Sequence, residues 1–204
     1  MIRADIRARL VKRLRIPPAG DPLLDEPTLN DCIAQALTDV SNVRDWPWLL
    51  TTASVTFTAG VGPLPTSCVK TRDLVINGWR ARPSDLAEFL DQATYATMYM
   101  WSIIGPNIQL NPAPVTSPTN TLYYIRSEPA LTTETQAPLI PDAHLPAVLS
   151  RASYHAEIIR ARSDAAGFHN GEYEIDIKRM MDATKRSNRP RQIREAGYQR
   201  WASW

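Results

Sequence analysis

The residues of this sequence with the greatest capacity for chemistry are three histidines, His144, His155 and His169. A zinc protease would place two histidines and a glutamate as HExxH on one helix, and the sequence does not contain that motif. His144 and His155 are able to share a helix face, but no carboxylate stands beside them at ligand spacing. The pattern favours surface or capping histidines over a metal site.

An acidic cluster, Glu172, Glu174 and Asp176, is the second candidate for chemistry. Glu172 and Asp176 are four residues apart, so on a helix they share one face, as a pair of catalytic carboxylates would require. Lys178 and Arg179 follow directly, which is typical of a charged face exposed to solvent. We therefore interpret the cluster as a helix surface and assign it no catalytic role.

The sequence lacks the motifs that usually accompany a catalytic nucleophile or a phosphate-binding loop. A Ser/His/Asp triad has no fixed spacing, but the chain has no GxSxG turn to present a serine. The two glycines within residues 60–62 are followed by a proline-rich stretch, which matches neither a Walker A loop nor GxGxxG. Cys32 and Cys68 stand far apart, and we expect two reduced thiols. The sequence predicts no enzyme, no catalytic residue, no cofactor and no metal.

Composition and charge narrow the class of protein. The chain has 204 residues, 44% of them hydrophobic, and no apolar run near the roughly 18 residues of a membrane span. The basic residues near the start also argue against a signal peptide. The net charge of +2 hides a segregation, since residues 1–16 carry +5, residues 185–204 carry +5, and the residues between carry −8. An acidic body with basic ends differs from a DNA-binding protein with one basic face.

Four proline-free or nearly proline-free stretches predict helices. The first, 1–16, has apolar residues at i+4 spacing, and the second, 28–46, begins with Thr28 as its predicted N-cap. Apolar stripes over 143–162 and 164–187 predict two further helices packed as a hairpin. These four helices would form a small bundle.

Between the second and third helices the apolar period changes from 3.6 to 2. Alternation predicts a strand within 53–58. Residues 69–76, 108–110 and 121–127 are also predicted to be strands, and Asn77-Gly78 is a strong hairpin signal. A short helix is expected within 84–92.

The predicted fold is therefore α+β. It has a four-helix bundle-like domain (1–50 and 142–187), a small β domain (51–141) inserted between the second and third helices, and an extended C-terminal tail (188–204). Pro190 blocks helix continuation into the tail, and no core pattern follows it.

The tail is rich in the side chains that anchor protein interfaces, because Arg, Tyr and Trp bury much area at low entropic cost. The alternative is a dangling, disordered terminus. We hypothesise that the tail is an arm that docks on a partner through seven residues: Arg189, Arg191, Arg194, Tyr198, Arg200, Trp201 and Trp204.

A succession of landmarks from Leu29 to about Met181 resembles the head-to-tail connector (adaptor) proteins of tailed bacteriophages, and more distantly the tail tubular A proteins. The departures are 95–101, which lacks the expected Gly-Pro-aromatic core, and the long tail. The landmarks are Trp46-Pro47-Trp48-Leu49-Leu50, Gly62-Pro63-Leu64-Pro65, the segment 105–114, the Tyr-containing strand at 122–125, the segment 128–132 and the segment 138–144.

This resemblance implies a non-enzymatic virion protein at the head-to-tail junction, assembled in the host cytoplasm. Such proteins form a ring, usually of twelve copies, under the portal and around the DNA exit channel. The implied partners are the portal protein, a downstream tail or stopper/nozzle protein, and passing double-stranded DNA bound without sequence specificity, with no membrane. An acidic body suits a channel that lets DNA slide. The alternative from another class is a basic-tailed DNA-binding protein.

Overall fold

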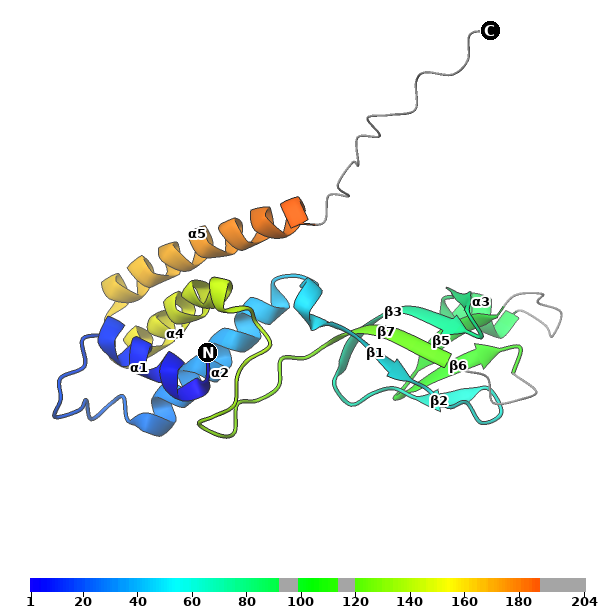
Figure 1. Cartoon of the computed structure of the whole chain (residues 1–204), viewed down its shortest axis with the longest axis horizontal. Helices are drawn as coiled ribbons and strands as arrows, with labels where there is room; N and C mark the ends of the chain where they lie inside the picture. Colours follow the sequence, from blue (N-terminus) through cyan, green and yellow to red (C-terminus); the bar gives the residue numbers. More distant parts are fainter. Residues whose placement is uncertain (92–98, 114–119, 188–204) are drawn as a thin grey trace, which may run out of the picture.

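The computed structural model describes residues 1–91, 99–113 and 120–187 of the chain. Four helices gather at one end of the molecule and a curled sheet occupies the other (Figure 1). The chain passes from the helices to the sheet after the second helix, and returns through residues 127–141. The four helices are α1 (Arg3–Arg13), α2 (Glu26–Asn42), α4 (Leu145–Ile159) and α5 (Ser163–Ser187).

Helix α2 shows why the helical end forms where it does. Its N-cap is Asp25, whose carboxylate accepts the backbone N–H of Thr28 at 3.0 Å. The helix thus begins earlier than the predicted N-cap at Thr28. Helix α4 lies at the centre and packs against α1, α2 and α5. The core that they share includes Ile6, Leu10, Leu29, Ile33, Leu37, Val40, Leu145, Val148, Ala152 and Ala156.

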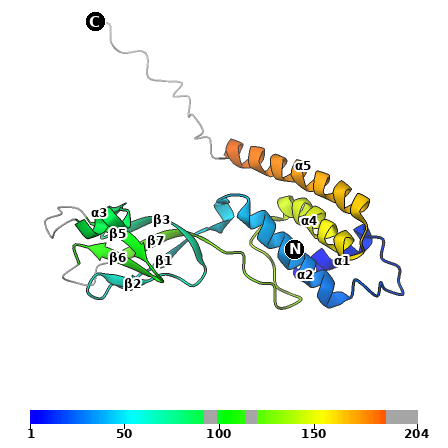
Figure 2. The same cartoon turned by 180° about the vertical axis from the view of Figure 1, so that it is seen from behind.

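The sheet has seven strands in the order β1-β7-β3-β4-β5-β6-β2, and every pairing is antiparallel except that of β4 with β5 (Figures 1 and 2). A short helix, α3 (Leu86–Asp91), lies beside it. The strands are β1 (Leu50–Ser54), β2 (Val61–Pro63), β3 (Cys68–Ile76), β4 (Trp79–Pro83), β5 (Met100–Ile104), β6 (Asn107–Asn111) and β7 (Asn120–Arg126).

The sheet encloses its own apolar core, in which Leu74, Ile76 and Leu122 are fully buried. The predicted hairpin is confirmed, because β3 and β4 pair across Asn77 and Gly78. Both turn residues have positive φ, 50° and 83°, as a two-residue turn matched to the strand twist requires.

The predicted fold class is wrong. Over the described residues the molecule is a mixed α/β protein with a seven-stranded curled sheet and five α-helices, not a four-helix bundle with a small inserted β domain. The sheet was underestimated because its short strands β2, β4 and β5 carry no clear alternation. The proposed domain boundaries stay a prediction, and the arm at 188–204 lies outside the described residues. In the described part of the chain, no helix is long and apolar enough to cross a membrane.

Two glycines test how tightly this fold is packed. A Cβ added at Gly62 in β2 would lie 2.7 Å from Cγ1 of the buried Val55 and 3.1 Å from the Phe57 ring. We expect Gly62→Ala to lower the free energy of unfolding by about 1–3 kcal/mol. The matched Gly171→Ala on α5 meets no atom within 4 Å, and it should raise stability by about 0.5–1 kcal/mol. Chemical denaturation measures both, and effects of the same sign would contradict this packing.

Candidate interaction site at the junction of helices and sheet

The junction is built on a corner of stacked tryptophans between α2 and β1. Trp46 is fully buried, and its indole Nε1–H donates to the carbonyl of Val40 in the last turns of α2 at 2.7 Å. Its ring stacks on Trp48 with centroids 4.7 Å apart, and Trp48 in turn lies 5.2 Å from the His144 ring. The corner thus joins the end of α2, the 3-10 turn η1 (Pro47–Leu49) and the turn η2 (Asp142–His144) that precedes α4.

Charged side chains tie this corner to the sheet. Asp45 accepts Lys70 Nζ at 2.9 Å and also pairs with Arg72, both from β3. The Lys70 hydrogen bond, aided by the charge of Arg72, lowers the pKa of the Asp45 carboxyl despite its partial burial. Asp45 is therefore ionised at neutral pH and holds β3 against the corner.

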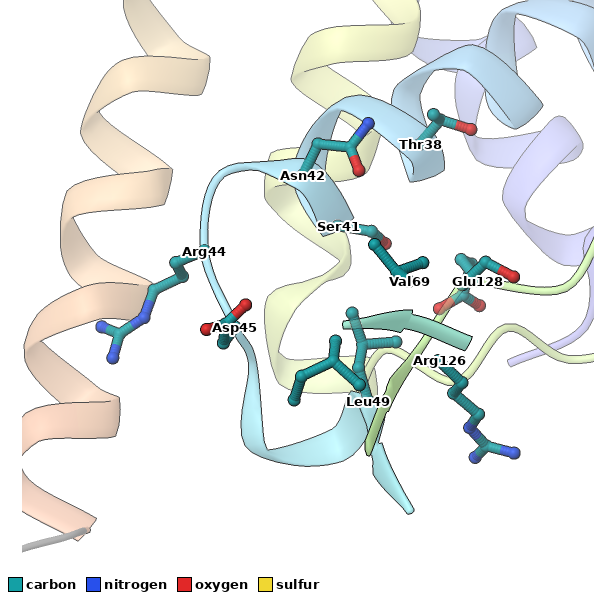
Figure 3. A pocket seen from close by; sticks show the side chains of 11 residues that line it. Thr38, Ser41, Asn42, Arg44, Asp45, Leu49, Val69, Arg126 and Glu128 are labelled. Carbon is teal, nitrogen blue, oxygen red and sulfur yellow. The ribbon is translucent and has the colours of Figure 1, made fainter. Parts of the chain in front are cut away.

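A cavity of about 160 Å³ lies at this junction, between the end of α2 and strands β3 and β7 (Figure 3). In Figure 3 Glu128 lies on the side of β7, facing the polar end of α2, whereas Arg44 extends away from the cavity. Hydroxyl, amide and carboxylate groups share its wall with aliphatic side chains. The lining residues are Thr38, Ser41, Asn42, Arg44, Asp45, Leu49, Val69, Ile125, Arg126, Ser127 and Glu128.

Glu128 is the unusual group of the cavity. Its Oε1 accepts the backbone N–H of Leu139 at 2.6 Å, whereas its buried Oε2 has no hydrogen-bond partner. Burial raises the pKa of the Glu128 carboxyl, and the Leu139 N–H and the Arg126 charge only partly oppose that effect. Such a carboxyl can accept a hydrogen bond from a bound donor. The other carboxyl of the described lining, Asp45, is paired with Lys70 and Arg72.

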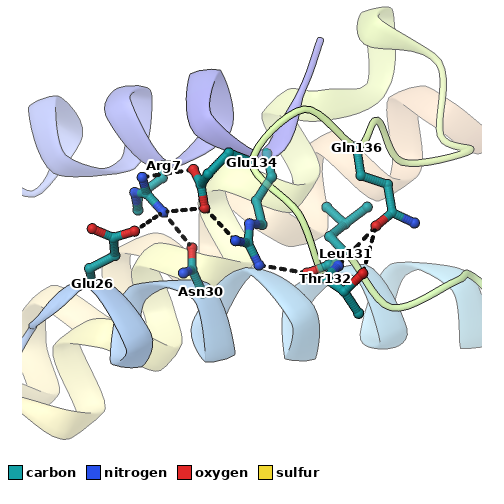
Figure 4. A network of polar contacts seen from close by, with 8 residues as sticks. Arg7, Glu26, Asn30, Leu131, Thr132, Glu134 and Gln136 are labelled. Atoms are coloured by element: carbon teal, nitrogen blue, oxygen red, sulfur yellow. Dashed lines mark hydrogen bonds and ion pairs between the residues drawn. The ribbon is translucent and has the colours of Figure 1, made fainter.

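A second polar network fastens the returning segment, residues 127–141, to the helices (Figure 4). Arg7 on α1 bonds to Glu26 and to Glu134, at 2.8 Å in each case. Arg3 also pairs with Glu134 and donates to the carbonyl of Leu131 at 2.7 Å. The segment further caps α1, because the carbonyls of residues 134 and 136 accept the backbone N–H groups of its first turn.

Each histidine has an ordinary structural partner in the described structure. His144 packs on Trp48, and His155 Nε2 lies 3.0 Å from a carboxylate oxygen of Asp39. His169 Nδ1 lies 2.9 Å from Glu172 Oε2. Within the described ranges no group of three or more His, Cys, Asp or Glu side chains is gathered as a metal site would need.

The acidic cluster on α5 is less exposed than its sequence indicated. Glu172 pairs with Arg13 of α1 at 2.5 Å, and Asp176 accepts the hydroxyl of Ser150 on α4 at 3.2 Å. Only Glu174 fits the predicted solvent-exposed face, where it accepts from Asn170 at 3.0 Å. No local signal identifies these pairs, because their partners are far away in the sequence.

The residues predicted to dock on a partner are not part of this junction as described. All seven lie beyond residue 187, outside the described residues: Arg189, Arg191, Arg194, Tyr198, Arg200, Trp201 and Trp204. The sequence reasoning found the tryptophan corner and the segment 128–132 as landmarks, but it missed the junction cavity and the burial of the Glu128 carboxyl.

The Glu134 network predicts a pH dependence of stability. Hydrogen bonds from Arg7 and Arg3 lower the pKa of Glu134 below its ordinary 4.5. A depressed folded-state pKa stabilises the fold above the unfolded value, and that contribution is lost as the pH falls through the folded pKa. Glu134→Gln should therefore lower the Tm at about pH 7, with a difference that shrinks at about pH 3. Glu174→Gln is the exposed control and should change little.

We expect Glu128→Gln to change the Tm at neutral pH in the opposite direction. A raised folded-state pKa makes its carboxylate unfavourable at neutral pH, so this variant should equal or exceed the native Tm at about pH 7 and match it in acid. Parallel pH profiles of the two variants would contradict the opposite environments seen for these carboxyls.

A family model described as SU10 adaptor protein matches residues 1–195. No curated protein matches the chain.

Proposed function

Because this chain belongs to the SU10 adaptor protein family, a family of phage head-to-tail adaptors, we propose that it forms a ring that docks under the portal. The ring, of about twelve copies, links the capsid vertex to the tail around the DNA exit channel. The family match over residues 1–195 is the observation that carries this proposal. The protein acts as a structural part of the virion and performs no chemistry.

The charge distribution supports a role around DNA. The residues between 16 and 185 carry a net charge of −8, so a channel lined by them repels phosphates and lets the duplex slide. Three of the six basic residues in the first sixteen, Arg3, Arg7 and Arg13, are held in ion pairs with carboxylates. That pairing weakens the alternative of a basic-tailed DNA-binding protein, which would bind DNA tightly and with steep salt dependence.

The partners follow from this position. One face of the ring meets the portal protein and the opposite face meets a downstream tail or stopper/nozzle protein. Residues 188–204 act as the arm that docks on the portal, with Trp201 and Trp204 in apolar pockets and arginines such as Arg194 facing carboxylates. A segment that orders on binding loses entropy, and anchors of this kind offset that loss.

Imaging of assembled particles tests the ring. We expect electron cryomicroscopy of the virion neck to show copies of this chain in closed cyclic symmetry around the DNA, even if the purified protein is monomeric. A single copy, an open filament or absence from the neck would overturn the proposal.

Deletion of residues 188–204 tests the arm. We expect the truncated protein to keep nearly its native Tm, because the apolar stripe of α5 ends near Thr184, and to lose attachment to portal-bearing heads. Sedimentation of heads with bound protein measures attachment. A matched control replaces only Gln192 and Gln199 by alanine, which leaves the aromatic and arginine anchors in place and should attach normally. Normal attachment of the deletion variant, or its unfolding, would show that the arm has another role.

A further inference from the structure

Strand β1 (Leu50–Ser54) is an edge strand of the sheet, and no strand pairs with its outer side in the described structure. It pairs with β7 alone, and no other strand of the described residues lies along its second edge. It begins directly after the tryptophan corner, so its position relative to the helices is fixed by that corner (Figure 1).

The register shows which backbone groups face the unused edge. The N–H of Val55 donates to the carbonyl of Asn120 at 3.3 Å, and the β1–β7 pairing continues in the same register. In an antiparallel ladder, alternate residues bond to the same neighbour. Thr51 and Ala53 therefore bond to β7, whereas the N–H and C=O groups of Thr52 and Ser54 point outward. The N–H of Leu50 donates to the carbonyl of Pro47 instead.

Nothing in β1 protects this edge. Proteins usually shield end strands with a charge, a proline, a bulge or extreme shortness. The sequence Leu-Thr-Thr-Ala-Ser has neither charge nor proline, and its pairing with β7 is free of bulges. The strand at the other end of the sheet, β2, is protected, because it has three residues and ends at Pro63.

A partly apolar hollow lies beside the start of β1. It has a volume of about 310 Å³, and its apolar and aromatic wall is formed by Leu50 of β1, Tyr123 and Ile125 of β7, and the corner residues Trp46 and Pro47. The charged residues Asp45, Arg72 and Asp73 complete the lining. The side chain of Leu50 is 49% exposed. A strand added beside β1 would place every second side chain on this face, within reach of the hollow.

Among the described strands, a second copy of the chain has none that is suited to supply the missing strand. Strands β3 to β7 already pair on both sides, and β2 is too short and ends in proline. Pairing of β1 with β1 of another copy would be two-fold symmetric and would close at two copies, unlike the ring contact proposed above.

We propose that the β1 edge binds an extended segment of a different virion protein, which adds a strand to the sheet and inserts an apolar side chain beside Leu50 and Tyr123. Main-chain hydrogen bonds to Thr52 and Ser54 hold the segment, and the hollow selects its side chain. This inference rests on the proposed adaptor role, because it names a protein of the neck as the partner.

Proline substitution at adjacent threonines tests the proposal in the full-length protein. Thr52→Pro removes an outward N–H and leaves the β7 ladder intact, so we expect a near-native Tm and at least a tenfold loss of incorporation into virions. Thr51→Pro removes an inward N–H and should lower the Tm. Native incorporation of a folded Thr52→Pro protein would overturn the proposal.

Two measurements on the unmodified chain guard against a variant that fails to fold. Amide exchange at Thr52 and Ser54 should be fast in the free protein and slow in the assembled neck, whereas exchange at Thr51 and Ala53 should be slow in both. Electron cryomicroscopy of the neck should show a strand from another protein beside β1. A bare edge, or β1 of a second copy, within an intact ring would overturn this inference alone, whereas absence of the ring would overturn the proposed function.

Discussion

The arrangement of the molecule depends on one buried side chain, Trp46. Its indole N–H bonds to the carbonyl of Val40 near the end of α2, which also accepts the backbone N–H of Val43 at 3.4 Å. Its ring is fully buried against Trp48, so truncation of such a side chain typically costs about 3–5 kcal/mol. Because β1 begins two residues after Trp48, the direction in which the sheet leaves the helices is set at this corner.

The second connection between the helical end and the sheet end of the molecule is electrostatic. Arg3 and Arg7 hold the returning segment at Glu134, and the same segment caps the first turn of α1. Exposed ion pairs contribute little one by one, but here two guanidinium groups and two backbone N–H groups converge on a few residues. The basic residues at the start of the chain thus act in folding. The charge segregation seen in the sequence therefore overstates how much positive charge the N-terminal end offers to a partner.

Periodicity predicted the helices well, since α1, α2, α4 and α5 each carry a long apolar stripe, and Asn77-Gly78 correctly indicated the β3–β4 hairpin. The sheet as a whole was not predictable in the same way. Strands β2, β4 and β5 have only three to five residues, and β4 carries two arginines whose partners, Asp73 and Glu88, become visible only in the fold. The pairs Arg13–Glu172 and Arg7–Glu134 join residues more than a hundred positions apart, and the burial that raises the pKa of the Glu128 carboxyl has no signal in the sequence around it.

The contacts at the tryptophan corner fix the orientation of the sheet relative to the helices, and this orientation matters for an adaptor protein. Rotation of the sheet against the helices would break the indole hydrogen bond, expose a buried tryptophan and separate Asp45 from Lys70. The cost of these losses together far exceeds thermal energy, so the orientation of the sheet is a property of the folded chain and needs no partner to impose it. Partners bound at the two ends of one copy are then held at a fixed spacing. In the ring that we propose, the geometry would come from each subunit, and the contacts between proteins would need only to provide affinity.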